Sequence, residues 1–181
     1  MKEVQFTEII TEDLEIIRNW RNSKEVSQFM YTDQYINKED QLSWFSKISK
    51  ETDCKYWLIK YNNIKIGLIN ITDIDLKLRT CSWAFYIGDA AYRDLGIGVK
   101  AEFELIEMVF FKLDLDVLFC EVVSTNFNVL NLHKKFGFRE LSFNKNYFVK
   151  NNISFDVVKL SLKKIDWIEI RDKLNTIIYK Q

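Results

Sequence analysis

The sequence has no proline, only five glycines and a single histidine in 181 residues. Without proline, the starts of helices must be predicted from capping residues instead of from a proline in the first turn. Three of the glycines, Gly88, Gly96 and Gly98, fall in one short segment. Backbone freedom is therefore concentrated where the chain is expected to approach another group closely.

The single histidine and the three cysteines limit the metal sites and disulfides that the chain can form. One histidine and three scattered cysteines cannot supply the ligand set of a zinc site, so no metal is expected. The cysteines Cys54, Cys81 and Cys120 are odd in number and form no Cys-x-x-Cys pair. This pattern favours reduced, buried thiols and a cytoplasmic location.

Neither sign of charge is in excess, since 26 Lys and Arg balance 26 Asp and Glu. We therefore expect no nucleic acid and no membrane surface as partner. The first five residues lack the apolar core of a signal peptide, and no apolar run approaches membrane-spanning length. Neither export nor membrane anchoring is expected.

The length and the 48% hydrophobic content predict one globular domain over residues 1–181. Hydrophobic periodicity predicts alternating strands and helices. Thr11 is the predicted cap of the first helix, and Asn37 with Asp40 the predicted capping pair of the second. The expected elements are a strand over 4–10, a helix over 13–22, a helix after Asn37, a hairpin of 56–61 and 65–73 turning at Asn62-Asn63, a strand over 80–87, a helix over 99–113, a strand over 117–123, a helix over 128–136 ended by Gly137, a hairpin of 138–148 and 153–161 turning at 150–152, and a C-terminal helix from about Lys164.

The glycine segment Arg93-Asp94-Leu95-Gly96-Ile97-Gly98 lies between a predicted strand and a predicted long helix. A helix that starts at such a loop presents unpaired amide N–H groups and the positive end of its dipole. The segment therefore predicts a loop that holds a pyrophosphate.

The order of elements, with Arg93-x-x-Gly96-x-Gly98 and a second segment from Asn126 through His133 and Lys135 to Phe138, resembles the GNAT N-acetyltransferases over nearly the whole chain. The resemblance implies an α/β (α+β) fold with a mostly antiparallel sheet of about seven strands, flanked by helices and splayed where acetyl-CoA inserts. It implies that acetyl-CoA is the acetyl donor. The implied acetyl-CoA contacts are Phe85, Tyr86 and Ile87 on the splayed strand, Arg93, Asp94, Leu95, Gly96, Ile97 and Gly98 in the loop, and Asn126 and Lys135 in the second segment.

The N-terminal half, with Trp20-Arg21-Asn22-Ser23, residues 29–33 and residues 39–45, is similar to the acetyltransferases of pseudaminic acid biosynthesis. That similarity implies transfer to the 4-amino group of a UDP-linked amino-dideoxy sugar. Branches that acetylate ribosomal protein N-termini share a similar Arg-Asn opening, so the substrate depends on residues 30–32 and on the segment around Trp44.

His133 stands where many family members place a tyrosine that protonates the CoA thiolate. An imidazole can serve that role, because it donates or shuttles a proton near neutral pH. The alternative is a partly buried helix residue without a proton role.

Glu121 lies in the otherwise apolar strand 117–123, where an acidic side chain needs a partner or a function. By resemblance it contacts the sugar amine as a base, with its pKa raised by burial. The alternative is an ion pair with a Lys or Arg on a neighbouring strand.

Arg21 is the candidate for uridine or phosphate contact, because a guanidinium group offers planar donors to a diphosphate. Its alternative is an exposed arginine at a helix end. Met30, Tyr31, Trp44 and Phe85 are the expected apolar wall beside the sugar, which a hydrophobic core could equally use, and Gln41 is expected near the nucleotide. Arg79 either neutralises a phosphate or forms an ordinary cross-strand pair.

Two other functions remain open. The first is a module that binds acyl-CoA without turnover, and the second is an acetyltransferase of protein N-termini or lysines. Balanced charge and the aromatic region between Tyr31 and Trp44 favour a small-molecule acceptor. The C-terminal helix, with Ile165, Ile168, Leu174 and Ile177 or Ile178, is expected to pack either within the chain or across a homodimer.

Overall fold

A computed structural model of the chain describes residues 4–179. The chain divides into two compact units. Unit 1 holds the described residues up to Ile74 together with Ala84–Ala101, and unit 2 holds Asp75–Trp83 and the described residues from Glu102 onward. The expectation of a single domain over 1–181 stays a prediction.

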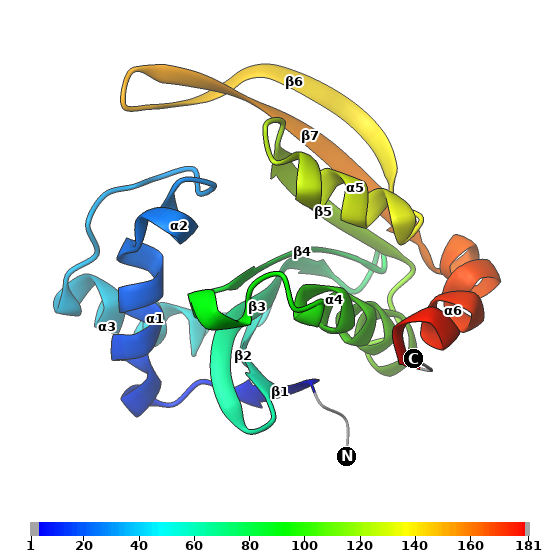
Figure 1. The fold of residues 1–181 in the computed structure, drawn as a ribbon, viewed down its shortest axis with the longest axis horizontal. Helices are drawn as coiled ribbons and strands as arrows, with labels where there is room; N and C mark the ends of the chain where they lie inside the picture. Colours follow the sequence, from blue (N-terminus) through cyan, green and yellow to red (C-terminus); the bar gives the residue numbers. More distant parts are fainter. Residues whose placement is uncertain (1–3, 180–181) are drawn as a thin grey trace. The chain divides into compact units, whose positions relative to one another are not determined.

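Seven strands form one hydrogen-bonded sheet in the order β1-β2-β3-β4-β5-β7-β6 (Figure 1). Pairing is antiparallel for β1 with β2, β2 with β3, β5 with β7 and β6 with β7, and parallel for β4 with β5. The mixed, mostly antiparallel sheet with helices confirms the predicted fold class. The strands are β1 (Val4–Glu8), β2 (Lys55–Tyr61), β3 (Ile64–Asp75), β4 (Thr80–Ile87), β5 (Val117–Val123), β6 (Arg139–Lys150) and β7 (Ile153–Lys163).

The parallel pairing of β4 with β5 is short. It covers three residue pairs, from Thr80 opposite Val117 to Ser82 opposite Phe119. Both strands run on for several residues after these pairs. Pairing that stops early is what a splay between two neighbouring strands requires.

In unit 1, helix α1 (Leu14–Asn22) confirms the helix predicted over 13–22, and it buries Leu14, Ile17 and Trp20 at helical spacing. Ile17 and Trp20 form a core cluster with Leu58 and Leu68. Fully burying such side chains stabilises a fold by about 2 kcal/mol each. The remaining elements of this unit are η1 (Thr11–Asp13), α2 (Lys24–Ser27), α3 (Lys38–Ile48) and η2 (Ala90–Tyr92).

The two predicted helix caps have different outcomes. Asn37 accepts a hydrogen bond from the Asp40 amide at 2.9 Å and Asp40 accepts one from the Asn37 amide at 3.1 Å, which confirms the capping pair of α3. The prediction for Thr11 is wrong, because Thr11 begins the 3₁₀ turn η1. The carboxylate of Asp13 instead accepts from the Ile10 amide at 3.2 Å and pairs with Lys65 of β3.

Both predicted hairpin turns use paired asparagines with positive φ. The values are 48° and 67° at Asn62 and Asn63, and 51° and 59° at Asn151 and Asn152. Asparagine tolerates this left-handed region, and two-residue hairpins require it.

Helix α4 (Ile97–Glu107) begins inside the glycine segment and is followed by a π-helical turn, η3 (Met108–Lys112). The sequence predicted one uninterrupted helix over 99–113. At the π turn the Leu113 amide bonds to the Met108 carbonyl at 3.0 Å. The adjacent residues Val109 and Phe110 are both fully buried in this turn.

In unit 2, α5 (Phe127–Lys135) ends before Gly137, whose φ of +87° confirms the predicted glycine stop. The C-terminal helix α6 (Lys164–Tyr179) packs through Trp167 against Phe103 and Phe136. The predicted contact residues Ile165 and Ile168 are 68% and 51% exposed, so packing of these two within the chain is wrong. A homodimer through α6 stays a prediction.

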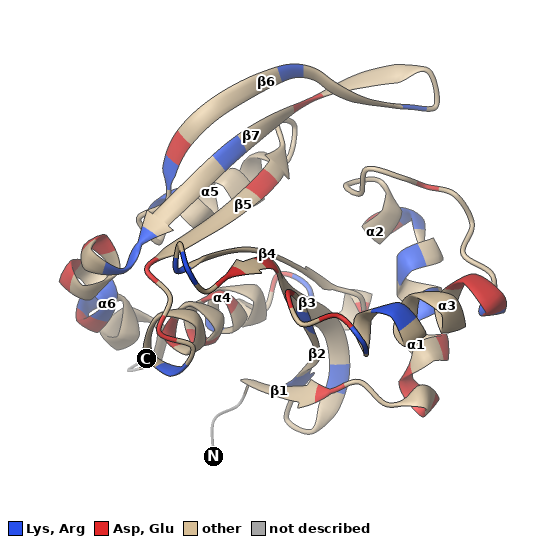
Figure 2. Cartoon of the chain, turned by 180° about the vertical axis from the view of Figure 1, so that it is seen from behind, with Lys and Arg blue, Asp and Glu red and all other residues tan. Residues whose placement is uncertain are grey.

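Acidic and basic residues both occur on β6, β7 and α6 (Figure 2), in keeping with the balanced composition. The three cysteines are free and buried, as predicted. Within residues 4–179, no helix combines the length and the apolar character that a membrane crossing needs.

Candidate active site

The glycine segment folds back onto the end of β4 in unit 1. The Arg93 guanidinium donates to the carbonyl oxygens of Ile87 and Gly88, both at 3.0 Å. Two donor groups of Arg93 are thus engaged by backbone carbonyls, and the start of the loop is held against the strand. Arg93 therefore shapes the loop, and the backbone amides at the start of α4 remain the candidate donors to a phosphate.

The two loop glycines leave the backbone open to a ligand. Gly96 has a φ of +73°, and a Cβ atom placed on it would meet no other atom within 4 Å. A Cβ atom on Gly98 would lie 3.4 Å from the ring of Phe85. The loop thus combines an exposed surface at Gly96 and Leu95 with a helix N-terminus, which fits an anionic diphosphate group.

Three predicted site residues of unit 1 hold enclosed polar atoms without a hydrogen-bond partner among residues 4–179. They are Nη1 of Arg21, Nε2 of Gln41 and the hydroxyl oxygen of Tyr86. Burial lowers the pKa of the Arg21 guanidinium and raises that of the Tyr86 hydroxyl, while the charge of Arg21 favours ionisation of Tyr86. An unpartnered buried polar group costs about 1–3 kcal/mol, so such groups are typical of ligand sites.

These residues belong to one region of unit 1. Trp44 and Tyr86 both pack against the core cluster that contains Trp20, the neighbour of Arg21. Gln41 lies one helical turn before Trp44 on α3, and Trp44 meets Tyr56 edge-on with ring centroids 5.3 Å apart. Of the other predicted wall residues, Tyr31 is exposed and Met30 and Phe85 are half-buried.

In unit 2, His133 is buried and hydrogen-bonded to a carboxyl group. Its Nδ1 lies 2.8 Å from Oε1 of Glu102, and both side chains are almost completely buried. Burial raises the pKa of Glu102, and the attraction of His133 opposes that shift. His133 is thus bonded to a second ionisable group. Its role as an acid and the alternative without a proton role both stay predictions.

The sequence reasoning missed Glu102. A usable signal was its place in the helix, since Glu102, Ile106 and Val109 recur at the spacing of one face and the last two are fully buried. An acidic residue on a buried helical face needs a partner. The histidine that provides it lies 31 residues further along the chain.

Glu121 faces away from the interior, which corrects the expected burial. Strand β5 alternates, so that Cys120 and Val122 are buried while Glu121 is exposed. Its Oε1 lies 2.6 Å from Nζ of Lys159, the residue opposite Glu121 on β7. The same Oε1 accepts a hydrogen bond from the Tyr147 hydroxyl at 3.2 Å. The ion pair raises the pKa of Lys159. The predicted ion-pair alternative is present, and the role of base stays a prediction.

The second predicted acetyl-CoA segment also lies in unit 2. Asn126 directly precedes α5, its side chain does not cap that helix, and its predicted contact with acetyl-CoA stays a prediction. Lys135, in the last turn of α5, is exposed.

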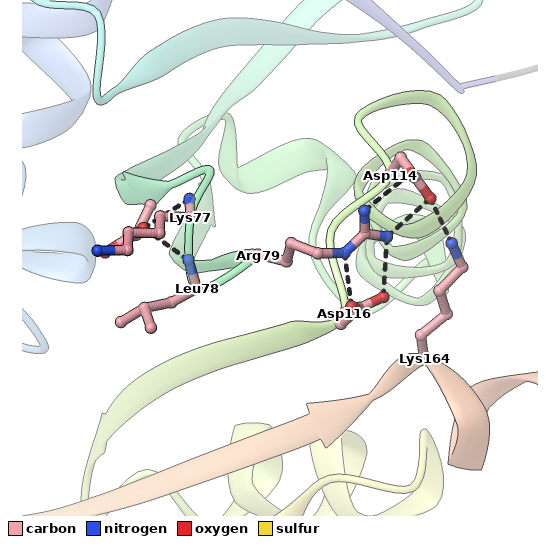
Figure 3. Close-up of polar contacts among 7 residues, drawn as sticks. Lys77, Leu78, Arg79, Asp114, Asp116 and Lys164 are labelled. Atoms are coloured by element: carbon pink, nitrogen blue, oxygen red, sulfur yellow. Dashed lines mark hydrogen bonds and ion pairs between the residues drawn. The ribbon is translucent and has the colours of Figure 1, made fainter.

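Arg79 is engaged by two carboxylates (Figure 3). Its Nε and Nη2 donate to Asp116 at 2.6 and 3.1 Å, and Nη1 donates to Asp114 at 3.0 Å. Asp114 also binds Lys164 at 2.8 Å. These hydrogen bonds raise the pKa of Arg79 and hold that of Asp114 at about 2. A neutralised guanidinium is a weak phosphate ligand, so the geometry favours a structural ion pair.

One group of three metal-ligand types occurs among the described residues: Glu51, Asp53 and Cys54, whose ligand atoms lie within 4.8 Å of one another. The Cys54 thiol lies 3.5 Å from Oε2 of Glu51 as a donor, and burial with this hydrogen bond raises its pKa to about 11. A protonated thiol is a poor metal ligand.

A family model of the GNAT acetyltransferase domain matches residues 4–139, and the chain belongs to this family. It is accordingly an acetyltransferase of the class that uses acetyl-CoA. The match spans the glycine segment, Glu102, Asn126 and His133.

The chain is similar to the acetyltransferase PseH of two Campylobacter jejuni strains. Identity is 29% over 143 residues for strain 81-176 and 28% over 144 residues for strain NCTC 11168, in each case 79% of this chain and 87% of the relative. Its fold is similar to the spermidine N-acetyltransferase of Vibrio cholerae in complex with CoA and spermine. That match has a TM-score of 0.86 and 16% identity, and it covers 93% of this chain and 99% of the other.

Proposed function

We propose that the protein transfers the acetyl group of acetyl-CoA to the 4-amino group of a UDP-linked amino-dideoxy sugar. The observation that carries the proposal is the set of enclosed polar atoms without partners on Arg21, Gln41 and Tyr86. All three belong to unit 1 and lie near aromatic side chains. A polar ligand that carries hydroxyl, amide and phosphate groups would satisfy them.

The similarity to PseH and the resemblance of the N-terminal half to pseudaminic acid acetyltransferases support this acceptor. Arg21 offers a planar donor set that suits a diphosphate. Trp44 and Tyr56 offer apolar faces that suit a deoxy sugar, whose methyl group replaces a hydroxyl.

Acetyl-CoA supplies the activated acyl group as a thioester. In the proposed assignment, amides of Gly96, Ile97 and Gly98 hold the pyrophosphate, and the backbone of residues 85–87 binds the pantetheine arm and polarises the thioester carbonyl. Asn126 and Lys135 contact the acetyl donor as well. Glu121 takes a proton from the attacking amine, directly or through water, and His133 gives one to the leaving sulfur.

The test is a screen of acceptors with acetyl-CoA, in which the release of free CoA thiol is measured. The panel contains a UDP-linked 4-amino-dideoxy sugar, the same sugar already N-acetylated at that position, peptides with free N-termini or lysines, and spermidine. We expect turnover with the free amino sugar, and none with its acetylated form, which lacks the nucleophilic amine.

Turnover confined to peptides or to spermidine would overturn the sugar-nucleotide assignment. Binding of acetyl-CoA without release of CoA thiol, whichever acceptor of the panel is added, would favour the non-catalytic module. Arg21→Met provides a matched variant, because it should lose affinity for the UDP sugar and keep its affinity for acetyl-CoA.

A further inference from the structure

Glu102 is a fully buried carboxyl group in α4 with an incomplete hydrogen-bond set. Its Oε1 contacts Nδ1 of His133 at 2.8 Å, while Oε2 has no partner within the described part of the chain. An apolar side chain of the same size would pack at this position at lower cost, since burying a carboxyl group costs several kcal/mol unless it is fully paired. The position therefore calls for a functional reason.

The imidazole of His133 is held in one orientation. The ring of Trp83 lies 5.1 Å from it and that of Phe138 lies 5.3 Å from it, centroid to centroid. With Nδ1 engaged by Glu102, Nε2 is the nitrogen left for a ligand. A side chain fixed by packing and by a second hydrogen bond is preorganised for one proton transfer.

The environment also selects how many protons the pair holds. A buried pair without net charge is favoured over one that carries a bare carboxylate. That neutral pair has one proton in the bond between Oε1 and Nδ1 and a second on Nε2. Burial, followed by the charge of Glu102, raises the pKa of the Cys120 thiol on β5 well above its ordinary value, so this thiol stays protonated and adds no charge to the pair.

We propose that Glu102 is a positioning residue for acetyl transfer, which fixes His133 through Nδ1 and keeps on Nε2 the proton that His133 gives to the sulfur of CoA. The inference rests on the proposed role of His133. As the tetrahedral intermediate collapses, the C–S bond breaks, its electron pair stays on sulfur, and sulfur takes the Nε2 proton. The pair then regains a proton from solvent.

The chain has one histidine, so protein labelled with ¹⁵N-histidine reports on this ring alone. At pH 7 we expect the wild-type spectrum to show a protonated Nε2 and an Nδ1 in a hydrogen bond. Glu102→Met removes the hydrogen bond with little change in volume, and its ring is expected to populate both neutral tautomers. A spectrum unchanged by the substitution would overturn the proposal. No acceptor is needed, so this result is independent of the proposed function.

Kinetics with the acceptor found in the screen give the second test. Glu102→Met should lower kcat by about 10- to 100-fold, a part of the 10²–10⁴-fold contribution typical of general acid catalysis, and leave both KM values within about 2-fold. The same substitution in a His133→Phe background should cause no further loss, because Glu102 acts through His133. Equal losses in the two backgrounds would show a merely structural role. Glu102→Gln, which keeps a hydrogen bond, should lose less activity than Glu102→Met, and the reverse order would also contradict the proposal.

Discussion

Nδ1 of His133 and Oε1 of Glu102 lie 2.8 Å apart in the interior of unit 2, one contributed by α5 and the other by α4. Each side chain is the hydrogen-bond partner of the other, and both are buried, with 3% of His133 and 0% of Glu102 exposed. The effect of substituting one residue on the free energy of unfolding therefore depends on the other residue, and a double-mutant cycle can measure this coupling.

His133→Phe alone should lower the free energy of unfolding by about 3 kcal/mol, because the phenyl ring fits between Trp83 and Phe138 but leaves the Glu102 carboxyl without a partner. The double variant with Glu102→Met should return to within about 1 kcal/mol of wild type, since no buried polar group is then left unpaired. Urea denaturation of the four proteins measures both values. Equal stability of wild type and the single variant would show that the hydrogen bond contributes nothing.

Arg21→Met should separate stability from binding. The buried Nη1 has no partner, so its removal should leave the free energy of unfolding unchanged or raise it by up to about 1 kcal/mol. The KM for the UDP amino sugar should rise at least about 10-fold, because an Arg–phosphate interaction is charge-assisted. Titration calorimetry with acetyl-CoA is the control and should show unchanged affinity. A large loss of stability would instead identify Arg21 as a structural residue.

Gly96→Ala should weaken acetyl-CoA binding through the loop backbone. At a φ of +73° a Cβ atom costs about 1 kcal/mol, and at this position it also projects into open space where a ligand is expected. Asn152→Ala, at a φ of +59° in an exposed hairpin turn, is the matched control for backbone strain. Denaturation should show similar losses in the two variants, while calorimetry should show reduced acetyl-CoA affinity only for Gly96→Ala. Reduced affinity in both, or in neither, would argue against the loop as the pyrophosphate site.

Glu121→Gln should reduce kcat at saturating amine by about 100-fold if the carboxylate is the base. Lys159→Met is the companion variant, because it breaks the 2.6 Å ion pair but leaves the carboxylate in place, and its kcat should stay within about 3-fold of wild type. Steady-state rates at several pH values test both variants. An unchanged kcat for Glu121→Gln would remove Glu121 from the mechanism and leave the cross-strand ion pair as its role.

The ion pairs of Asp114 should appear in acid unfolding. Its pKa in the folded protein is about 2, below the ordinary value of 3.8, because Arg79 and Lys164 favour the carboxylate. The stabilisation is therefore fully present above about pH 4 and is lost as the pH falls toward 2. The difference in melting temperature between wild type and Asp114→Asn should be constant from pH 5 to 7 and shrink between pH 4 and pH 2. A difference that does not change over this range would contradict the assignment.

Several local features were predictable because the forces that set them act within a few residues. The paired asparagines at 62–63 and 151–152 adopt positive φ, and Gly137 ends α5, since both depend on the steric freedom of the residue itself. The Asn37 cap depends on a residue three positions away. The π turn after Glu107 was not predictable in this way, because the apolar pattern over 99–113 is that of one continuous helix, and the hydrogen bond from the Leu113 amide to the Met108 carbonyl is seen only in the structure.

For the site residues too, nearby residues set some features and distant residues set others. Strand alternation shows that Glu121 points to the opposite face from Cys120 and Val122, but whether that face is covered depends on the rest of the fold. Asp13, and not Thr11, precedes the first helix, and its pairing with Lys65, 52 residues away, is seen only in the structure.

The sequence by itself determined the family and the acetyl donor class, because these follow from short motifs and from the order of elements, while the position of the pyrophosphate loop stays a prediction. Only the tertiary structure decided which polar groups are enclosed and which are paired. It placed Glu102 beside His133, gave Arg79 to Asp114 and Asp116, and left Arg21, Gln41 and Tyr86 with unpaired atoms. Burial and hydrogen bonding depend on residues far apart in the chain, and no local pattern encodes them.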